Sequence, residues 1–404
     1  MRLLGNLRVL NLAALGITLL ALSGCAASSL REAVPEKLAS NVKIAGMGNV
    51  RAWGDHSGGA LKLFLAEEVP LIKAQQASLA KDQPLHSHIL ALSGGADDGA
   101  FGAGLLVGWT ARGTRPQFNV VTGISAGALI APFAFLGADY DPQLRAIFSN
   151  TDGDDIYKTN ILQGLTGGTA LADSAPLAAL IEKYVDAELM ARLARERAKN
   201  RLLIIGTTNL DAQRPVYWDV GKIAQSGRPD AIQLIRKVLL ASASIPGLFP
   251  PVNIRVTSGG KSYEEMHVDG GPTREVFFAP ADFSFRALDK LVGRDVQRTL
   301  WVIRNGKLEP EYAPVDSNAL AISQRSLETL TKYQGLGDLA RMYQKARSEG
   351  IAFNLSSIPA SFSAPRPQPF ARDYMRTLFD AGYGLGKTGV SWAKVPPGAR
   401  NVGG

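Results

Sequence analysis

The strongest constraint on the fold is an alternation of short apolar runs with helix-length segments, which starts at Ile89. HILAL and FNVVT have the length and composition of strands, and each precedes a longer segment rich in small and apolar residues. Further elements are predicted as strands at RLLIIGTTNL and TLWVIR, a hairpin at IRVTSGGKSYEEMHV, and helices at AIQLIRKVLLASA and at residues 318–349 with a break between Gly335 and Gly337. Such alternation is typical of a mainly parallel sheet between helical layers. We therefore predict an α/β three-layer sandwich.

Two glycine-rich motifs each lie between a predicted strand and a predicted helix. GISAG at residues 123–127 fits the G-x-S-x-G pattern, in which a serine occupies a tight turn and glycines two residues away let the chains pass. At a helix N-terminus the Ser125 hydroxyl would lie where backbone N–H groups favour negative charge. GGADDG at residues 94–99 can turn backbone amides toward a developing oxyanion. Its spacing matches neither the P-loop nor the dinucleotide fingerprint.

The base that would activate Ser125 has two candidates. The chain has 4 histidines, and only His267 follows Ser125 in the sequence. His267 lies two residues before Asp269 in EEMHVDGGP, and alternate residues of a strand point to the same side, so direction alone does not choose between them. Asp269 begins an Asp-Gly-Gly turn at a strand end, where functional residues of α/β folds gather. The residues alone leave both a Ser125–Asp269 pair and a histidine-dependent triad open.

Together these motifs resemble those of the patatin-like acyl hydrolases. The glycine-rich loop, the serine turn and the Asp-Gly-Gly turn occur in the order of that family, and ASASIPGLFPPV at residues 241–252 resembles the segment that precedes its aspartate. The resemblance covers residues 85–276 and implies a Ser-Asp dyad without histidine. It makes Ser125 the nucleophile and Asp269 the base. It also implies an oxyanion hole formed by the amides around Gly94, Gly95 and Ala96.

The loop departs from the family pattern, which is commonly GGGxRG, at two positions. Ala96 replaces a glycine, and alanine is compatible with this position only if its φ angle is not positive. Asp98 replaces a lysine or arginine, which removes a positive charge that could hold an anionic headgroup or the oxyanion. This substitution leaves neutral esters and lysolipids open as substrates beside phospholipids.

The activity implied by the resemblance is hydrolysis of carboxylic esters of lipids. A phospholipase A, a lysophospholipase or a lipid esterase would each form a covalent acyl-enzyme on Ser125 and release a fatty acid, with no metal or organic cofactor. Two alternatives remain: an α/β-hydrolase-type esterase that uses Ser125 and His267, and a non-catalytic envelope lipoprotein that binds lipid. The expected partner in each case is a lipid.

The N-terminus indicates export. Arg2 and Arg8 lie before an apolar run at residues 9–22, which is too short for a comfortable membrane span. The run ends at the first residue of LSGC, and the Cys25 of this motif is the only cysteine in the chain. This stretch resembles a bacterial lipoprotein signal, in which the cysteine is lipidated and anchors the chain to a membrane. Ala26, where an aspartate would favour the inner membrane, points to the outer membrane of a bacterial cell envelope.

The predicted organisation is a signal peptide at residues 1–24, a tether at 25–45, an N-terminal extension at 46–84 with a helix near 57–68, a hydrolase domain at 85–395 and a tail at 396–404. The net charge of +8 is carried by scattered residues without aromatic interleaving, which favours a solvated basic surface over nucleic-acid binding. AGYGLGKT at residues 381–388 satisfies a relaxed P-loop pattern. It follows a helical segment rather than a strand, so we expect a glycine-bearing helix junction there.

Overall fold

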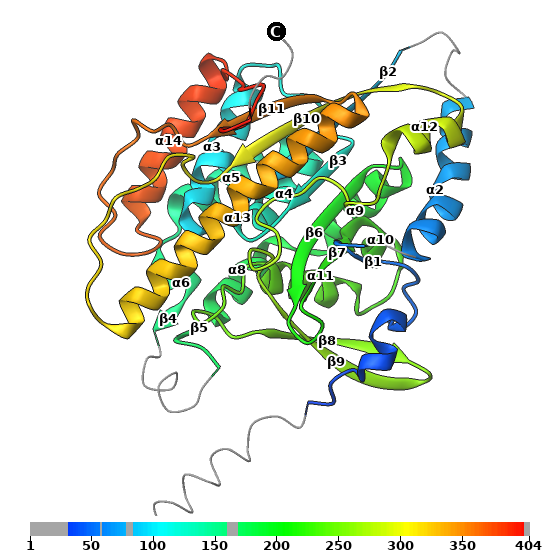
Figure 1. Cartoon of the computed structure of the whole chain (residues 1–404), viewed down its shortest axis with the longest axis horizontal. Helices are drawn as coiled ribbons and strands as arrows, with labels where there is room; N and C mark the ends of the chain where they lie inside the picture. The colour runs from blue at the N-terminus through cyan, green and yellow to red at the C-terminus, as the bar shows by residue number, and fades with distance from the viewer. Residues whose placement is uncertain (1–30, 57–58, 78–83, 160–168, 400–404) are drawn as a thin grey trace, which may run out of the picture.

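The computed structural model describes residues 31–56, 59–77, 84–159 and 169–399 (Figure 1). The expected signal peptide and Cys25 lie outside these ranges, so lipidation and export stay predictions. Within the described ranges, every helix is too short or too polar to cross a lipid bilayer.

The core is a nine-stranded sheet whose central strands are parallel. These central strands follow the order β6 (Leu202–Asn209), β3 (Val120–Gly123), β2 (Leu85–Leu92), β10 (Val296–Arg304) and β11 (Ala352–Ser357). Antiparallel strands continue the sheet beyond β6: β7 (Arg214–Asp219), β1 (Arg51–Trp53), and a hairpin of β8 (Val252–Ser258) and β9 (Lys261–Val268) that pairs with β6 through β9. The mainly parallel sheet confirms the predicted fold class.

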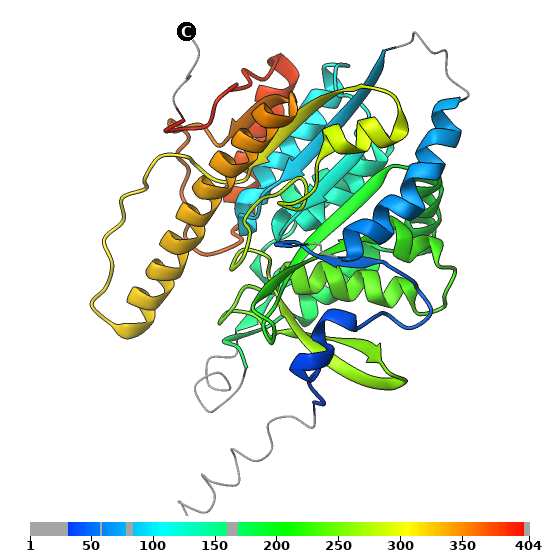
Figure 2. The same ribbon diagram turned by 45° about the vertical axis from the view of Figure 1, so that its right-hand side comes forward.

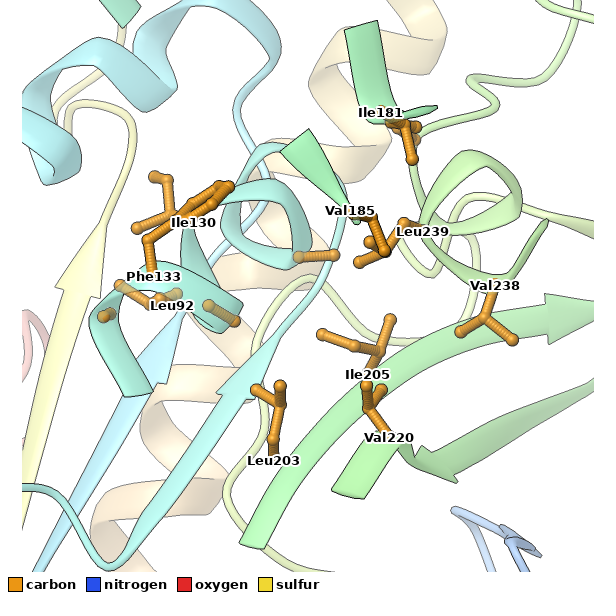
Figure 3. Close-up of a cluster of buried hydrophobic side chains, with 14 of the residues drawn as sticks. Leu92, Ile130, Phe133, Ile181, Val185, Leu203, Ile205, Val220, Val238 and Leu239 are labelled. Carbon is orange, nitrogen blue, oxygen red and sulfur yellow. The ribbon is translucent and has the colours of Figure 1, made fainter. Parts of the chain in front are cut away.

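Helices cover both faces of this sheet (Figures 1 and 2). One layer contains α3 (Gly99–Ala111), α4 (Ala126–Leu136), α11 (Ala231–Ser242) and α14 (Arg372–Thr388), and the other contains α2 (Gly59–Ala77), α12 (Phe285–Val292) and α13 (Ala319–Glu349). In β2, Leu90 and Leu92 face the first layer, whereas Ile89 and Ala91 face the second. The second half of the strand, residues 89–92, is apolar because both of its sides are buried there. Figure 3 shows part of the first core, where side chains from the sheet and from several helices meet.

The structure differs from the sequence-based expectation at three elements. Helix α13 runs without a break through Gly335 and Gly337, α2 continues nine residues beyond the expected end at residue 68, and β11 was not predicted. Gly335 does not break the helix but lets the Arg304 side chain pack against it, because a Cβ there would lie 2.2 Å from Nη1 of Arg304. A glycine inside a helix costs only about 1 kcal/mol relative to alanine, so the helix continues through it.

Part of the expected tether packs against the sheet. The backbone groups of Lys43 and Thr257 exchange two hydrogen bonds of 3.0 and 2.8 Å, and the Glu264 amide donates to the carbonyl oxygen of Glu32 at 2.9 Å. The unpaired edges of the β8–β9 hairpin supply these partners. In the extension, β1 adds an antiparallel strand to β7. Both N-terminal segments are therefore joined to the central sheet where the structure describes them.

Helices α3 and α14 pack backbone against backbone. Gly104 and Gly108 on α3 face Gly382 and Gly386 on α14, and a Cβ at any of the four would lie 2.0 to 2.3 Å from a carbonyl oxygen of the other helix. The glycines of AGYGLGKT thus lie inside a helix and not at a junction, and two of them allow this close contact. Gly384, between them, faces solvent and has no atom within 4 Å of its Cβ position.

We expect Gly382→Ala to lower the free energy of unfolding by about 2 kcal/mol, because the added methyl group forces the two helices apart. Gly384→Ala is the matched control in the same helix. It should raise the free energy of unfolding by up to about 1 kcal/mol through the better helix propensity of alanine. Urea denaturation at 25 °C measures both, and equal effects of the two variants would contradict the packing described here.

Candidate active site

Ser125 lies in a strained turn between β3 and α4. Its φ of 55° and ψ of −126° are rare for a residue with a side chain. Glycines make the turn possible, because a Cβ at Gly123 would lie 2.4 Å from the carbonyl oxygen of Gly127, and one at Gly127 would lie 2.5 Å from the carbonyl oxygen of Leu92. The predicted strand–turn–helix context of Ser125 is confirmed.

Asp269 follows β9 directly and is 4% exposed. Its Oδ1 accepts a hydrogen bond of 2.8 Å from the amide of Gly271. Its Oδ2 is buried and has no hydrogen-bond partner among the described residues. Burial raises the pKa of Asp269 to about 6, whereas the nearby Ser125 hydroxyl and the Gly271 amide lower it. The Ser125 hydroxyl therefore lies close to the buried Asp269 carboxylate, but in this structure it donates no hydrogen bond to Oδ2.

The segment at residues 241–252 holds the serine and the aspartate together. Ser242 Oγ accepts the Ser125 amide at 3.1 Å and donates to the carbonyl oxygen of Gly206 at 2.7 Å. The carbonyl oxygen of Ser244 accepts the Asp269 amide at 2.9 Å. These bonds give a physical reason for a segment that the sequence marked only by resemblance.

The glycine-rich loop offers two free amides. The Gly94 amide donates to the carbonyl oxygen of Glu275 at 3.1 Å, so it is not free in this structure, and its part in an oxyanion hole stays a prediction. The amides of Gly95 and Ala96 have no acceptor within the part of the chain that the structure describes. Ala96 has a φ of 51°, which corrects the expectation of a non-positive angle. This conformation costs an alanine about 1–2 kcal/mol, and it turns the loop into the short 3₁₀ turn that opens α3.

The two aspartates of the loop bind the C-terminal part of the chain. Asp97 forms an ion pair with Arg366 and accepts the amide of Phe370 at 3.0 Å. Asp98 accepts the hydroxyl of Tyr374 at 2.6 Å. Burial and the neighbouring Asp97 raise the pKa of Asp98 to about 6, against the lowering effect of Tyr374. A cation is thus present beside the loop, but it comes from Arg366 and is paired.

An apolar pocket of about 40 Å³ borders Ser125 and Ala96. Helices α5 (Asp141–Asn150), α8 (Ala175–Tyr184) and α14 contribute to its walls. Its larger apolar side chains include Leu129, Ile147, Phe148, Leu177, Phe249 and Met375. This volume holds about three waters, so a longer hydrocarbon chain requires the walls to move apart.

His267 is occupied elsewhere. Its Nδ1 lies 3.0 Å from Thr207 Oγ1, its Nε2 lies 3.1 Å from Glu265 Oε2, and Arg51 pairs with the same glutamate. Burial lowers the pKa of the fully buried His267 imidazole, although Glu265 raises it. Both ring nitrogens therefore serve a structural network, and neither contacts Ser125.

Sequence reasoning missed a second buried carboxyl group, that of Glu275. A Cβ at Gly94 would lie 2.7 Å from its Oε1, and one at Gly271 would lie 3.2 Å from its Oε2. Burial raises the pKa of Glu275 to about 8, with Arg304 lowering it and Asp269 raising it. Glu275 belongs to no motif, so only its position between the glycine-rich loop and the Asp-Gly-Gly turn identifies it.

Comparison with known proteins places the site in a family. The profile described as patatin-like phospholipase matches residues 90–282. A search of curated protein sequences finds no match. VipD from Legionella pneumophila is similar over 76% of this chain and 67% of its own, with 11% identity and a TM-score of 0.32.

Human GIVD cytosolic phospholipase A2 is similar over 80% of this chain, with 11% identity and a TM-score of 0.32. The match spans only 55% of the human chain. The family profile contains the glycine-rich loop, the serine turn, the segment before the aspartate and the Asp-Gly-Gly turn. Residues 90–282 therefore form a domain of the patatin-like phospholipase family, whose enzymes hydrolyse lipid esters.

Proposed function

We propose that this chain is a serine acyl hydrolase of lipid esters that works through a Ser125–Asp269 dyad and a covalent acyl-enzyme. The observation that carries the proposal is the free, buried Oδ2 of Asp269 close to the hydroxyl of Ser125, beside an apolar pocket. A buried carboxylate with a raised pKa is a better base than an exposed one, because it binds the proton more tightly.

In the first step, Asp269 Oδ2 takes the proton of Ser125 Oγ while this oxygen attacks the ester carbonyl. The oxyanion that forms is stabilised by the free amides of Gly95 and Ala96. When the tetrahedral intermediate collapses, Asp269 returns the proton to the leaving alcohol. The acyl group remains on Ser125, and its hydrocarbon chain occupies the apolar pocket.

Deacylation repeats these steps with water as the nucleophile. Asp269 removes a proton from water, the hydroxide attacks the acyl-enzyme, and the same two amides stabilise the second oxyanion. Ser125 then recovers its proton, and a fatty acid leaves. Headgroup and positional preference decide whether the enzyme is a phospholipase A, a lysophospholipase or a lipid esterase, and product analysis against a lipid panel distinguishes them.

The cellular location remains a prediction from the sequence. We propose that lipidated Cys25 anchors the enzyme to a bacterial membrane, the outer membrane by the identity of Ala26. The described chain starts at Arg31, whose guanidinium pairs with Asp211 at 2.6 Å, so a short segment would separate the anchor from the domain.

Ser125→Ala should abolish labelling by a fluorophosphonate, because the reagent needs the serine oxygen. Asp269→Asn should slow labelling by at least about 100-fold, because the amide cannot accept the proton. Asp380→Asn, at an exposed aspartate, is the control and should label like the wild type. Labelling of Ser125→Ala would contradict the nucleophile, and absence of labelling in the wild type would favour a lipid-binding protein without turnover.

His267→Gln separates the dyad from a histidine-dependent triad. We expect kcat/KM per folded molecule to stay within about threefold of the wild type, because His267 is bonded to Thr207 and Glu265 and not to Ser125. The unfolding free energy should fall by about 1–3 kcal/mol as these buried bonds are lost. A loss of kcat/KM above 100-fold, on the scale of removing a general base, would favour the triad.

The pH dependence of kcat/KM should report the base. Asp269 acts only when deprotonated, and its pKa is raised to about 6. With a neutral ester as substrate, kcat/KM should rise with pH up to about 7 and be about tenfold below its plateau at pH 5. Steady-state assays from pH 4 to 8 measure this profile. A plateau that extends below pH 5 would mean that a different group accepts the proton.

A further inference from the structure

The N-terminal half of α13 and the segment before it expose an unusual number of large apolar side chains. Leu330 is 69% exposed and Tyr333 is 63% exposed. The other members of this surface are Tyr312, Val315, Ile322 and Leu327. We refer to residues 312–333 as the apolar arm. In Figures 1 and 2 it extends to one side of the molecule, beyond the helices that cover the sheet.

The apolar side of α13 changes direction along the helix. In its C-terminal half, Leu339, Met342 and Ala346 are buried against the core. At 100° per residue, the side that carries them continues upstream through Arg325 and Lys332, which are polar. Ile322, Leu330 and Tyr333 lie on the opposite side of the helix and point to solvent.

The polar side of the arm is the one that contacts the protein. Lys332 donates to the carbonyl oxygen of Glu309, and Arg325 donates to the carbonyl oxygen of Glu311. An ordinary surface helix places its apolar side inward and its charges outward. This helix does the reverse over its first four turns, so its large apolar side chains there are exposed.

The apolar arm is attached directly to the candidate active site. Gln334, the residue that follows the arm in α13, donates from Nε2 to the carbonyl oxygen of Thr273 at 3.0 Å, just after the Asp-Gly-Gly turn. Thr331 Cγ2 lies 3.7 Å from the Cβ position of Gly271. The segment before the arm follows the end of β10, and Ser125 follows the end of the parallel strand β3 in the same sheet.

We propose that the apolar arm inserts into the surface of a zwitterionic lipid bilayer and thereby brings the Ser125 site to its substrate. This inference rests on the proposed function, because a lipid ester with long acyl chains resides in a bilayer. Aliphatic residues together with tyrosine are typical of helices that lie in the interface between headgroups and acyl chains. Residues 307–333 contain three basic and four acidic side chains, so their near-zero charge fits a zwitterionic surface better than an anionic one.

The first test reads the position of the arm directly. In the full chain with Cys25→Ser, a single cysteine is introduced by Leu330→Cys and labelled with the environment-sensitive dye NBD. On addition of phosphatidylcholine vesicles, the emission should shift to shorter wavelength and become accessible to a quencher in the lipid phase. Leu291→Cys is the matched control, because Leu291 is 49% exposed on α12, away from the arm. No spectral change at position 330, or an equal change at 291, would overturn the proposal.

The second test links the arm to turnover. Leu330→Ser combined with Tyr333→Ser should lower kcat/KM on phosphatidylcholine vesicles at least about tenfold, the factor expected from losing the insertion of one apolar side chain. On a monomeric short-chain ester, kcat/KM should match the wild type, because neither residue lines the pocket. Leu291→Ser should leave both rates unchanged. If the double variant is no slower on vesicles than Leu291→Ser, the arm does not deliver the site to lipid.

These outcomes separate the two proposals. Absence of wild-type turnover of both substrates would refute the proposed hydrolase, while the NBD measurement would still show whether the arm inserts. Turnover of the short-chain ester together with an unchanged NBD spectrum would retain the hydrolase and refute the lipid contact, leaving a protein partner to cover the arm.

Discussion

The close approach of β2, β3 and α4 leaves no room for a side chain at Gly123 or Gly127, the positions two residues before and after Ser125. A Cβ on Gly127 would overlap the carbonyl oxygen of Leu92, and one on Gly123 would overlap Gly127 itself. The resulting turn forces Ser125 into a strained conformation that only its surroundings maintain. Ser242 provides the main restraint, since its hydroxyl bridges the Ser125 amide to the neighbouring strand β6.

Buried carboxyl groups surround this turn, and burial raises the pKa of several of them. Asp269 lies close to Ser125 and Glu275 lies close to Gly94 and Gly271, whereas Asp97 and Asp98 belong to the glycine-rich loop itself. Charged carboxylates this deep are costly unless they are paired. Asp97 and Asp98 have hydrogen-bond partners, but one oxygen of Asp269 has none among the described residues. That difference distinguishes a carboxylate available for proton transfer from one that holds the structure together.

The sequence predicts the fold well because local patterns determine it. Strands buried on both faces are continuous apolar runs, and the glycines on either side of the Ser125 turn allow the close backbone contacts that the turn requires. The sequence does not predict β11, because its pairing depends on β10, some fifty residues earlier. The continuity of α13 through Gly335 was missed for a similar reason, since the arginine that occupies the space beside this glycine lies on a distant strand.

The candidate site was predictable to a lesser degree. Motifs in the sequence predict roles for Ser125 and Asp269, and the structure brings the two residues close together. The hydrogen bond that occupies the Gly94 amide depends on the carbonyl oxygen of Glu275, which no sequence pattern places there. The partners of Asp98 were likewise hidden, because Tyr374 is distant in the sequence and reaches the loop only through the packing of α14 on α3.

The contact between the glycine-rich loop and the C-terminal segment affects the order in which the site can be assembled. Arg366, Phe370 and Tyr374 bind the loop aspartates, and α14 occupies the groove that the α3 glycines leave open. A ribosome releases these residues after all four motifs of the site have been made. A growing or truncated chain therefore contains Ser125 and Asp269 but lacks the residues that hold the glycine-rich loop. The glycine-rich loop therefore gains its supporting contacts only after the C-terminal segment has been made and packed.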